Sequence, residues 1–149
     1  MIQARYSPGD ARGVHDPDLV ELVRRANEAA NRRDFDALLS FFAPDAVLDL
    51  SHRELPSVEG AAAIRALFED WFEPYEEFAV EQEEVLDLGN GVVFAVTHQN
   101  ARPAGSAGHV RQREGWVLVW EEGLTVQMTT YGDIDEARAA AERLAEERG

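Results

Sequence analysis

Near the start of the chain, apolar residues recur with the period of an α-helix. Leu19, Val23, Ala26 and Ala30 have this spacing. Asp16-Pro17 precedes them and suits a helix start, because the carboxylate can accept free amide hydrogens and a proline needs no amide partner there. We therefore expect a first helix of about four turns that begins at Asp16.

Two more helices are predicted before residue 75. Asp34 can cap a short helix over 35–42, and Pro44 follows it. A short apolar strand is expected over 46–51. The strongest amphipathic pattern comes next, ends before Pro74, and consists of apolar residues at i, i+3, i+4, i+7 and i+8: Ile64, Leu67, Phe68, Trp71 and Phe72.

From residue 78 onward the period changes to two, which is typical of β-strands. Four strands are expected, over 78–88, 91–102, 110–122 and 124–132. Gly89-Asn90-Gly91 and Glu121-Glu122-Gly123 are suitable hairpin turns. The pattern therefore predicts an antiparallel meander.

A last helix is predicted over 134–148. Asp133 and Glu136 have the spacing of a capping box, but the apolar stripe behind them is weak, and we expect it to pack thinly. The order of elements is typical of an α+β domain with helices on one side of a mostly antiparallel sheet. Residues 116–120 are apolar on both faces of their strand, so we expect an identical subunit to cover the second face in a homodimer.

Composition narrows the chemistry. The 14 basic residues are all arginine, the 29 acidic residues bring the net charge to −15, and lysine and cysteine are absent. This excludes Schiff-base and P-loop lysines, cysteine nucleophiles, thiolate metal sites and disulfides. Because so acidic a surface repels phosphate groups, we expect neither nucleic acid nor membrane as a partner.

The organisation expected along the chain is simple. Residues 1–15 read as a flexible leader and 16–149 as one domain. Neither a signal-peptide run nor a stretch of 18 apolar residues occurs, so we expect a soluble, cytoplasmic protein.

The run 30–38, Ala-Asn-Arg-Arg-Asp-Phe-Asp-Ala-Leu, and the run 41–47, Phe-Phe-Ala-Pro-Asp-Ala-Val, resemble the opening of the SnoaL-like branch of the NTF2-like superfamily. Glu59-Gly60 before the Ile64 helix and a final strand ending in Tyr131-Gly132-Asp133 agree with it. The resemblance covers about Asp16 to Leu144. It implies an NTF2-like cone, a curved sheet wrapped around a long N-terminal helix, with an apolar pocket and usually a dimeric assembly.

The superfamily includes ketosteroid isomerase, polyketide cyclases, limonene-epoxide hydrolase, scytalone dehydratase and non-catalytic binding proteins. The isomerase's tyrosine, general base and oxyanion acid would fall at Ala26, Leu50 and near Trp116, and the cyclase's aspartate near Thr130. None of these residues supplies the family chemistry. Fold does not imply function, so the resemblance leaves the reaction open.

Strand parity gives a candidate site. If Phe94 and Val96 face the pocket, His98 and Asn100 share that face by period two. The matching sets on the next two strands place polar and aromatic groups beside them. The expected ligand-binding residues are Asn100, Gln112, Trp116, Trp120, Met128 and Thr130.

His98 and Glu114 are the candidate catalytic pair. A carboxylate that fixes an imidazole tautomer makes a general base, which suits cofactor-free isomerase, cyclase or hydratase chemistry on a small apolar organic ligand. The alternative is that both side chains meet at the rim and face solvent, in a ligand-binding or structural dimer without chemistry.

An aspartate and the histidines need separate explanations. Asp49 lies in an apolar strand, where a carboxylate needs a partner or a raised pKa; its parity favours a structural partner. His52 is expected to be a loop residue. The four histidines lack metal-ligand spacing, so neither a metal nor a cofactor is expected.

Overall fold

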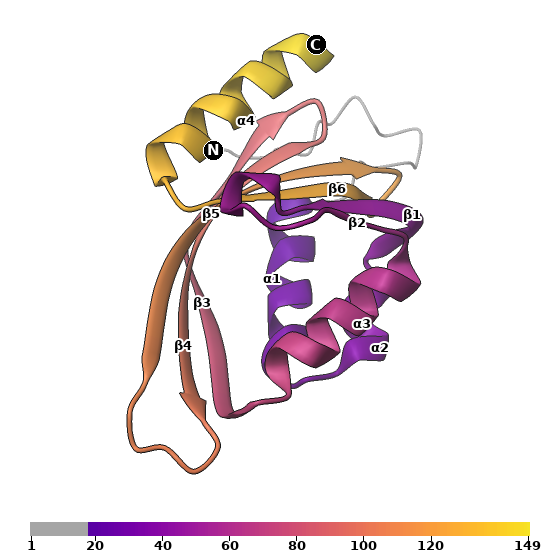
Figure 1. Cartoon of the computed structure of the whole chain (residues 1–149). Helices are drawn as coiled ribbons and strands as arrows, with labels where there is room; N and C mark the ends of the chain where they lie inside the picture. Colours follow the sequence, from indigo (N-terminus) through magenta and orange to yellow (C-terminus); the bar gives the residue numbers. More distant parts are fainter. Residues whose placement is uncertain (1–17) are drawn as a thin grey trace.

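The computed structural model describes residues 18–149, and its elements follow the predicted order (Figure 1). The leader predicted over 1–15 and the Asp16-Pro17 start lie outside the described residues. The elements are α1 (Leu19–Asn31), α2 (Phe35–Leu39), β1 (Phe42–Asp49), the 3₁₀ turn η2 (Ser51–Arg53), β2 (Val58–Glu59), α3 (Ala61–Phe72), β3 (Tyr75–Gly89), β4 (Val92–Pro103), β5 (Val110–Glu121), β6 (Leu124–Tyr131) and α4 (Ile134–Arg148).

One curved sheet carries the six strands in the order β2-β1-β6-β5-β4-β3. All neighbours are antiparallel except β1 and β6, which run parallel. The predicted meander β3 to β6 is confirmed. Its β3–β4 turn has Asn90 at φ 57° and Gly91 at φ 80°, and its β5–β6 turn has Glu122 at φ 54° and Gly123 at φ 81°. Two central residues of positive φ match the twist of antiparallel strands.

The sheet curls around α1, which crosses its concave face, while α2 and α3 close the wide end of the cone (Figure 1). The predicted α+β architecture, a curved sheet wrapped around a long N-terminal helix, is confirmed. Asn31 ties α1 to the sheet, because its side chain accepts from the Val80 amide at 2.7 Å and donates to the Val80 carbonyl at 3.0 Å. The helix is therefore held at a fixed position over β3.

Two predicted boundaries differ. The cap of α1 is Asp18, whose Oδ1 accepts from the Glu21 amide at 3.2 Å. The short second helix ends at Leu39, and β1 begins at Phe42 rather than at residue 46. Pro44 is exposed within β1 where the pairing with β6 shifts register, and a bulge of this kind is where a strand tolerates proline. Asp34 and Asp133 cap α2 and α4 as expected.

The thin packing expected of the C-terminal helix is wrong. Ala137 and Ala141 of α4 are fully buried, and the helix lies on the convex face of the sheet against Phe94, Val96 and Val117. Small side chains let the helix approach closely, so a modest apolar stripe suffices. Much of the second sheet face is therefore covered by α4 of the same chain. The apolar residues on that face do not require a partner subunit to cover them.

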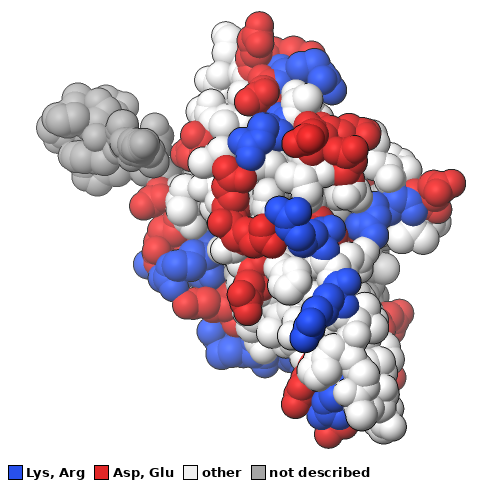
Figure 2. All heavy atoms as spheres, turned by 90° about the vertical axis from the view of Figure 1, so that its left-hand side faces the viewer, with Lys and Arg blue, Asp and Glu red and all other residues white. Residues whose placement is uncertain are grey.

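The homodimer stays a prediction. On the face of the molecule that Figure 2 shows, which is the left-hand side in Figure 1, acidic and basic side chains are intermixed rather than separated into patches. Several of them pair across strands and helices, such as Glu83 with Arg113 at 2.9 Å and Glu84 with Arg138 at 2.8 Å. None of the helices between residues 18 and 149 is long and apolar enough to cross a membrane.

Candidate functional site

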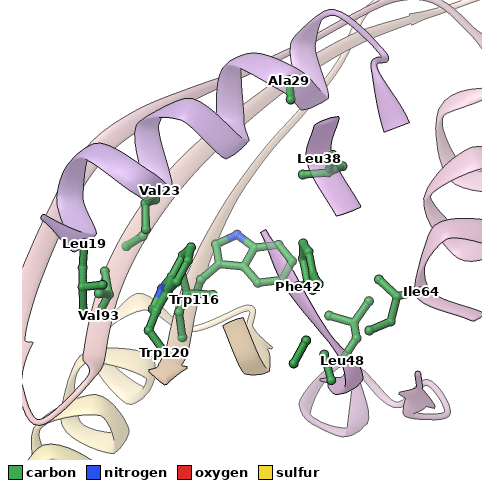
Figure 3. Packing of buried hydrophobic residues seen from close by; sticks show 14 of the residues in the cluster. Leu19, Val23, Ala29, Leu38, Phe42, Leu48, Ile64, Val93, Trp116 and Trp120 are labelled. Atoms are coloured by element: carbon green, nitrogen blue, oxygen red, sulfur yellow. The ribbon is translucent and has the colours of Figure 1, made fainter. Parts of the chain in front are cut away.

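A cavity of about 120 Å³ lies between α1 and the concave face of the sheet. Its walls come from the helices α1, α2 and α3, from the start of β1, and from strands β3 to β6. Trp116 extends from β5 toward Phe42, Trp120 lies beside it, and Val23 of α1 lies across from them (Figure 3). The lining is mostly apolar and rich in aromatic rings: Phe42, Phe68, Trp71, Phe72, Phe78, Trp116 and Trp120.

Glu114 is the ionisable group of this cavity. Among the lining residues, all of them within 18–149, no other side chain titrates; the remaining polar ones are Asn27, Gln82, Thr97, Gln99 and Thr125. Only 5 % of Glu114 is exposed. The inward parity of β5, shared with Trp116 and Trp120, points its carboxyl group at the concave side.

Arg53 holds one oxygen of Glu114. Its Nη1 donates to Glu114 Oε2 at 2.8 Å, and the Thr130 hydroxyl donates to the same oxygen at 3.4 Å. No hydrogen bond reaches Oε1 from any residue in the described part of the chain. Arg53 approaches from η2, outside the cavity lining, so the carboxyl group lies between the cavity and this partly exposed arginine.

Burial raises the pKa of Glu114 above its ordinary value, because the charged form loses its hydration. The positive charge and hydrogen bond of Arg53, and then the Thr130 hydroxyl, act in the opposite direction but do not cancel the effect of burial. A carboxyl group whose pKa lies closer to neutrality can exchange a proton with a ligand.

A row of polar side chains continues across the strands from Glu114. Thr97 of β4 pairs with Glu114 in the sheet, and Gln82 of β3 pairs with Thr97. The Thr97 hydroxyl accepts the indole N–H of Trp116 at 2.9 Å. This hydrogen bond fixes the tilt of the Trp116 ring, so the polar row and the aromatic wall form one rigid surface.

The structure does not bring His98 and Glu114 together, so the predicted pair is wrong. Thr97 is opposite Glu114, whereas His98 is opposite Arg113. Because successive residues of a strand face opposite sides, His98 lies on the convex face, with Glu81 as its neighbour on β3. The imidazole is therefore separated from the cavity by the sheet.

The other predicted site residues divide into three groups. Trp116, Trp120 and Met128 line the cavity. Thr130 is buried behind it as a partner of Glu114, and Gln112 pairs with Gln99 beyond the lining. Asn100 is wrongly placed in the prediction: it lies on the convex face, where its side chain contacts His109 at 3.0 Å. Whether the lining residues bind a ligand stays a prediction.

The error has a local physical cause. Residues 92–96 are apolar at every position, because α1 buries one face of β4 and α4 buries the other. A strand buried on both faces loses its period of two, so parity cannot be assigned from hydrophobicity. The parity of β4 therefore hides Thr97 and Gln99. Gln82 of β3 and Asn27 of α1 were not expected at the site, and nothing in the local sequence pairs Arg53 with Glu114.

Asp49 has the structural partners that its parity favoured. Its Oδ1 accepts from the Ser51 amide at 2.9 Å, the Ser51 hydroxyl at 2.6 Å and the Ser57 hydroxyl at 3.1 Å. The Ser51 side-chain hydrogen bond is the main reason that the pKa of Asp49 is lowered. His52 is exposed in η2, where its ring stacks on Tyr131 at 4.2 Å.

No group of three or more histidine, cysteine, aspartate or glutamate side chains within 18–149 is arranged to hold a metal ion. The cavity itself presents one carboxyl group, amides and hydroxyls. These groups can form hydrogen bonds with a ligand, and Glu114 can also take or give one proton.

The fold is similar to that of solved structures whose sequences differ strongly from this chain. One is a hypothetical protein with a ketosteroid isomerase-like fold from Catenulispora acidiphila in complex with trimethylamine (TM-score 0.67, 14% identity, 81% of this chain and 92% of that chain). Another is Rv0760c from Mycobacterium tuberculosis in complex with estradiol-17beta-hemisuccinate (TM-score 0.66, 16% identity, 78% and 94%).

A third is a putative SnoaL-like polyketide cyclase from Shewanella denitrificans (TM-score 0.66, 14% identity, 87% and 99%). At such identities the likeness shows the fold alone. Comparison with curated protein sequences found no significant match. The model of the SnoaL-like domain matches residues 23–128, and the chain therefore belongs to the SnoaL-like family.

Proposed function

We propose that this protein binds a small, largely apolar organic molecule in the cavity, with the polar end of that molecule at Glu114. One observation carries the proposal: a single buried carboxyl group lies in a mostly apolar, aromatic lining. Small-molecule sites have this composition, because apolar walls supply affinity and a few placed polar groups fix orientation. That related folds were crystallised with trimethylamine and with a steroid hemisuccinate supports it.

Size limits the ligand. A cavity of about 120 Å³ is comparable with engineered apolar cavities of about 150 Å³ that hold benzene. A compound of six to eight non-hydrogen atoms, on the order of one ring, therefore suits the enclosed part. Toluene and phenol are matched probes, because they are nearly equal in size and the methyl group of toluene is replaced by a hydroxyl group in phenol.

Both compounds are expected to bind with a saturable change in tryptophan fluorescence, because Trp71, Trp116 and Trp120 are all the tryptophans of the chain and all line the cavity. Phenol should bind about fivefold more tightly than toluene, since its hydroxyl can donate to the carboxylate. Glu114→Gln should remove most of this preference. The absence of saturable binding by either compound would contradict the proposal.

Acid–base catalysis is the second candidate, and the raised pKa of Glu114 favours it. In the simplest reaction the carboxylate of Glu114 would take an α-proton from a ketone and leave the enolate. After exchange of that proton with solvent, Glu114 would return a solvent-derived proton to the same carbon. His98 has no part in it. Under this candidate, the protein accelerates exchange of the α-hydrogens of cyclohexanone in heavy water, measured by proton NMR, and Glu114→Gln abolishes the acceleration. Equal rates for both proteins would leave ligand binding without catalysis.

A further inference from the structure

The lining of the cavity is electrically one-sided. Aromatic rings carry partial negative charge on their faces, and they make up much of this wall. Glu114 adds a carboxylate, and no lysine, arginine or histidine belongs to the lining within residues 18–149. The one polar group of opposite preference is the indole N–H of Trp120, a buried donor without a partner among the described residues. The only charge in this lining is therefore negative, and most of its rings can face a positive charge.

Arg53 does not remove this preference. It contacts only Oε2 of Glu114 and does so from outside the lining, so Oε1 accepts no hydrogen bond among the described residues. Arg53 also leaves the burial of the carboxylate incompletely compensated, since the pKa of Glu114 stays above its ordinary value. A second cation on the cavity side would lower the free energy of the ionised carboxylate.

Trp116 is the ring best placed to contribute. It lies two residues from Glu114 on the same face of β5, and its N–H is already bonded to Thr97. The indole has no free donor that would repel a cation. Tryptophan is also the side chain that attracts a cation most strongly through its ring face.

Charge outside the cavity acts in the same direction. The net charge of −15 raises the local concentration of cations around the molecule and lowers that of anions. A carboxylate or phosphate ligand would meet repulsion both at the surface and at Glu114.

Resting on the proposed function, we propose that the cavity binds an organic cation, an alkylated amine or quaternary ammonium compound, with its positive centre between Glu114 and Trp116. Its alkyl groups pack on the aromatic wall formed with α3. This assigns a ligand class that the apolar lining alone would not select, because an uncharged hydrocarbon would leave the carboxylate uncompensated.

Choline and 3,3-dimethylbutan-1-ol separate charge from shape, because they differ in replacing the positive nitrogen by carbon. Titrations at low ionic strength, followed by calorimetry and tryptophan fluorescence, should show choline binding at least tenfold more tightly. Glu114→Gln should reduce the difference to less than threefold. Glu83→Gln is the matched control, since it removes the same charge and an arginine partner on the convex face, and it should keep the wild-type preference.

The pH dependence gives a second readout in the unmodified protein. The charge of choline does not titrate, and Arg53, the charged side chain that contacts Glu114, stays positive. Choline affinity should therefore fall as the pH is lowered through the raised pKa of Glu114, while affinity for the alcohol stays constant. This readout holds even if Glu114→Gln proves poorly folded by circular dichroism.

The outcomes are distinguishable. Equal or tighter binding of the alcohol would overturn the cation assignment and leave the proposed function standing. A choline preference that persists in a folded Glu114→Gln variant, or that does not weaken at low pH, would also overturn it. Failure of both compounds, together with toluene and phenol, to bind would overturn both proposals.

Discussion

Replacing Gly115 with alanine should destabilise the fold by about 2 kcal/mol, although Gly→Ala within a strand usually stabilises a protein slightly. A methyl group at this position would lie 2.6 Å from the Cβ atom of Ala137 and 3.5 Å from the Cα atom of Ile134, both in α4. Ala137 is fully buried and cannot rotate away. The helix must therefore move off the sheet, which loosens its contacts with Phe94 and Val117.

Urea unfolding of a double-mutant cycle tests this explanation. Ala137→Gly removes the atom that the new methyl group would strike, so the effect of Gly115→Ala should be much smaller in that background. Gly108→Ala is the control, because the nearest atom to its new methyl group is the Ser106 hydroxyl at 3.7 Å. An equal effect of Gly115→Ala in both backgrounds would exclude the contact with α4 as the cause.

The same contact explains what could be predicted about this region from sequence. The position and cap of α4 follow from Asp133 and the residues after it, because helix starts depend on local hydrogen bonds. Its packing does not follow, since Ala137 and Ala141 carry little apolar area. The close packing depends on a glycine of β5 lying opposite alanines of α4. The hydrophobic pattern of either segment alone does not show that the two small surfaces meet.

The candidate site shows the same limit. On β5 the expected inward set, Glu114, Trp116 and Trp120, is the set that lines the cavity, although residues 116–120 are apolar on both faces. On β4 the apolar run from Val92 to Val96 hides the alternation, and the choice of Phe94 as inward reversed the whole strand. The reversed parity of β4 predicts His98 at the site, where the structure has Thr97. A shift of one residue along a strand moves every side chain to the other face.

Arg53 is the site residue that depends most on tertiary structure. It lies in a three-residue turn and reaches Glu114 across 61 residues of sequence. The position of that turn follows from the end of β1, which is fixed in turn by parallel pairing with β6. Glu114 could be predicted from parity, but its charged partner could not. Arg53 comes close to Glu114 only because β1 pairs in parallel with β6, and the hydrophobic pattern does not predict that pairing.

Arg53→Met should therefore destabilise the protein by about 2 kcal/mol at pH 7.5, and by much less at pH 4.5. Removing the guanidinium leaves the buried carboxyl group of Glu114 with only the Thr130 hydroxyl, so its pKa in the folded state rises further. The folded state then holds a proton that the unfolded state releases above its ordinary pKa of about 4.5. Stability must fall as the pH rises through this window.

The magnitude is bounded by the same reasoning. Keeping a glutamate protonated at pH 7.5, three units above its ordinary pKa, costs at most about 4 kcal/mol, and the partial exposure of Arg53 reduces the loss further. Arg113→Met is the matched control, because it breaks an exposed arginine–glutamate pair and should show little change at either pH. In urea unfolding at the two pH values, an equal loss of stability at both would mean that Arg53 acts through packing rather than through the charge of Glu114.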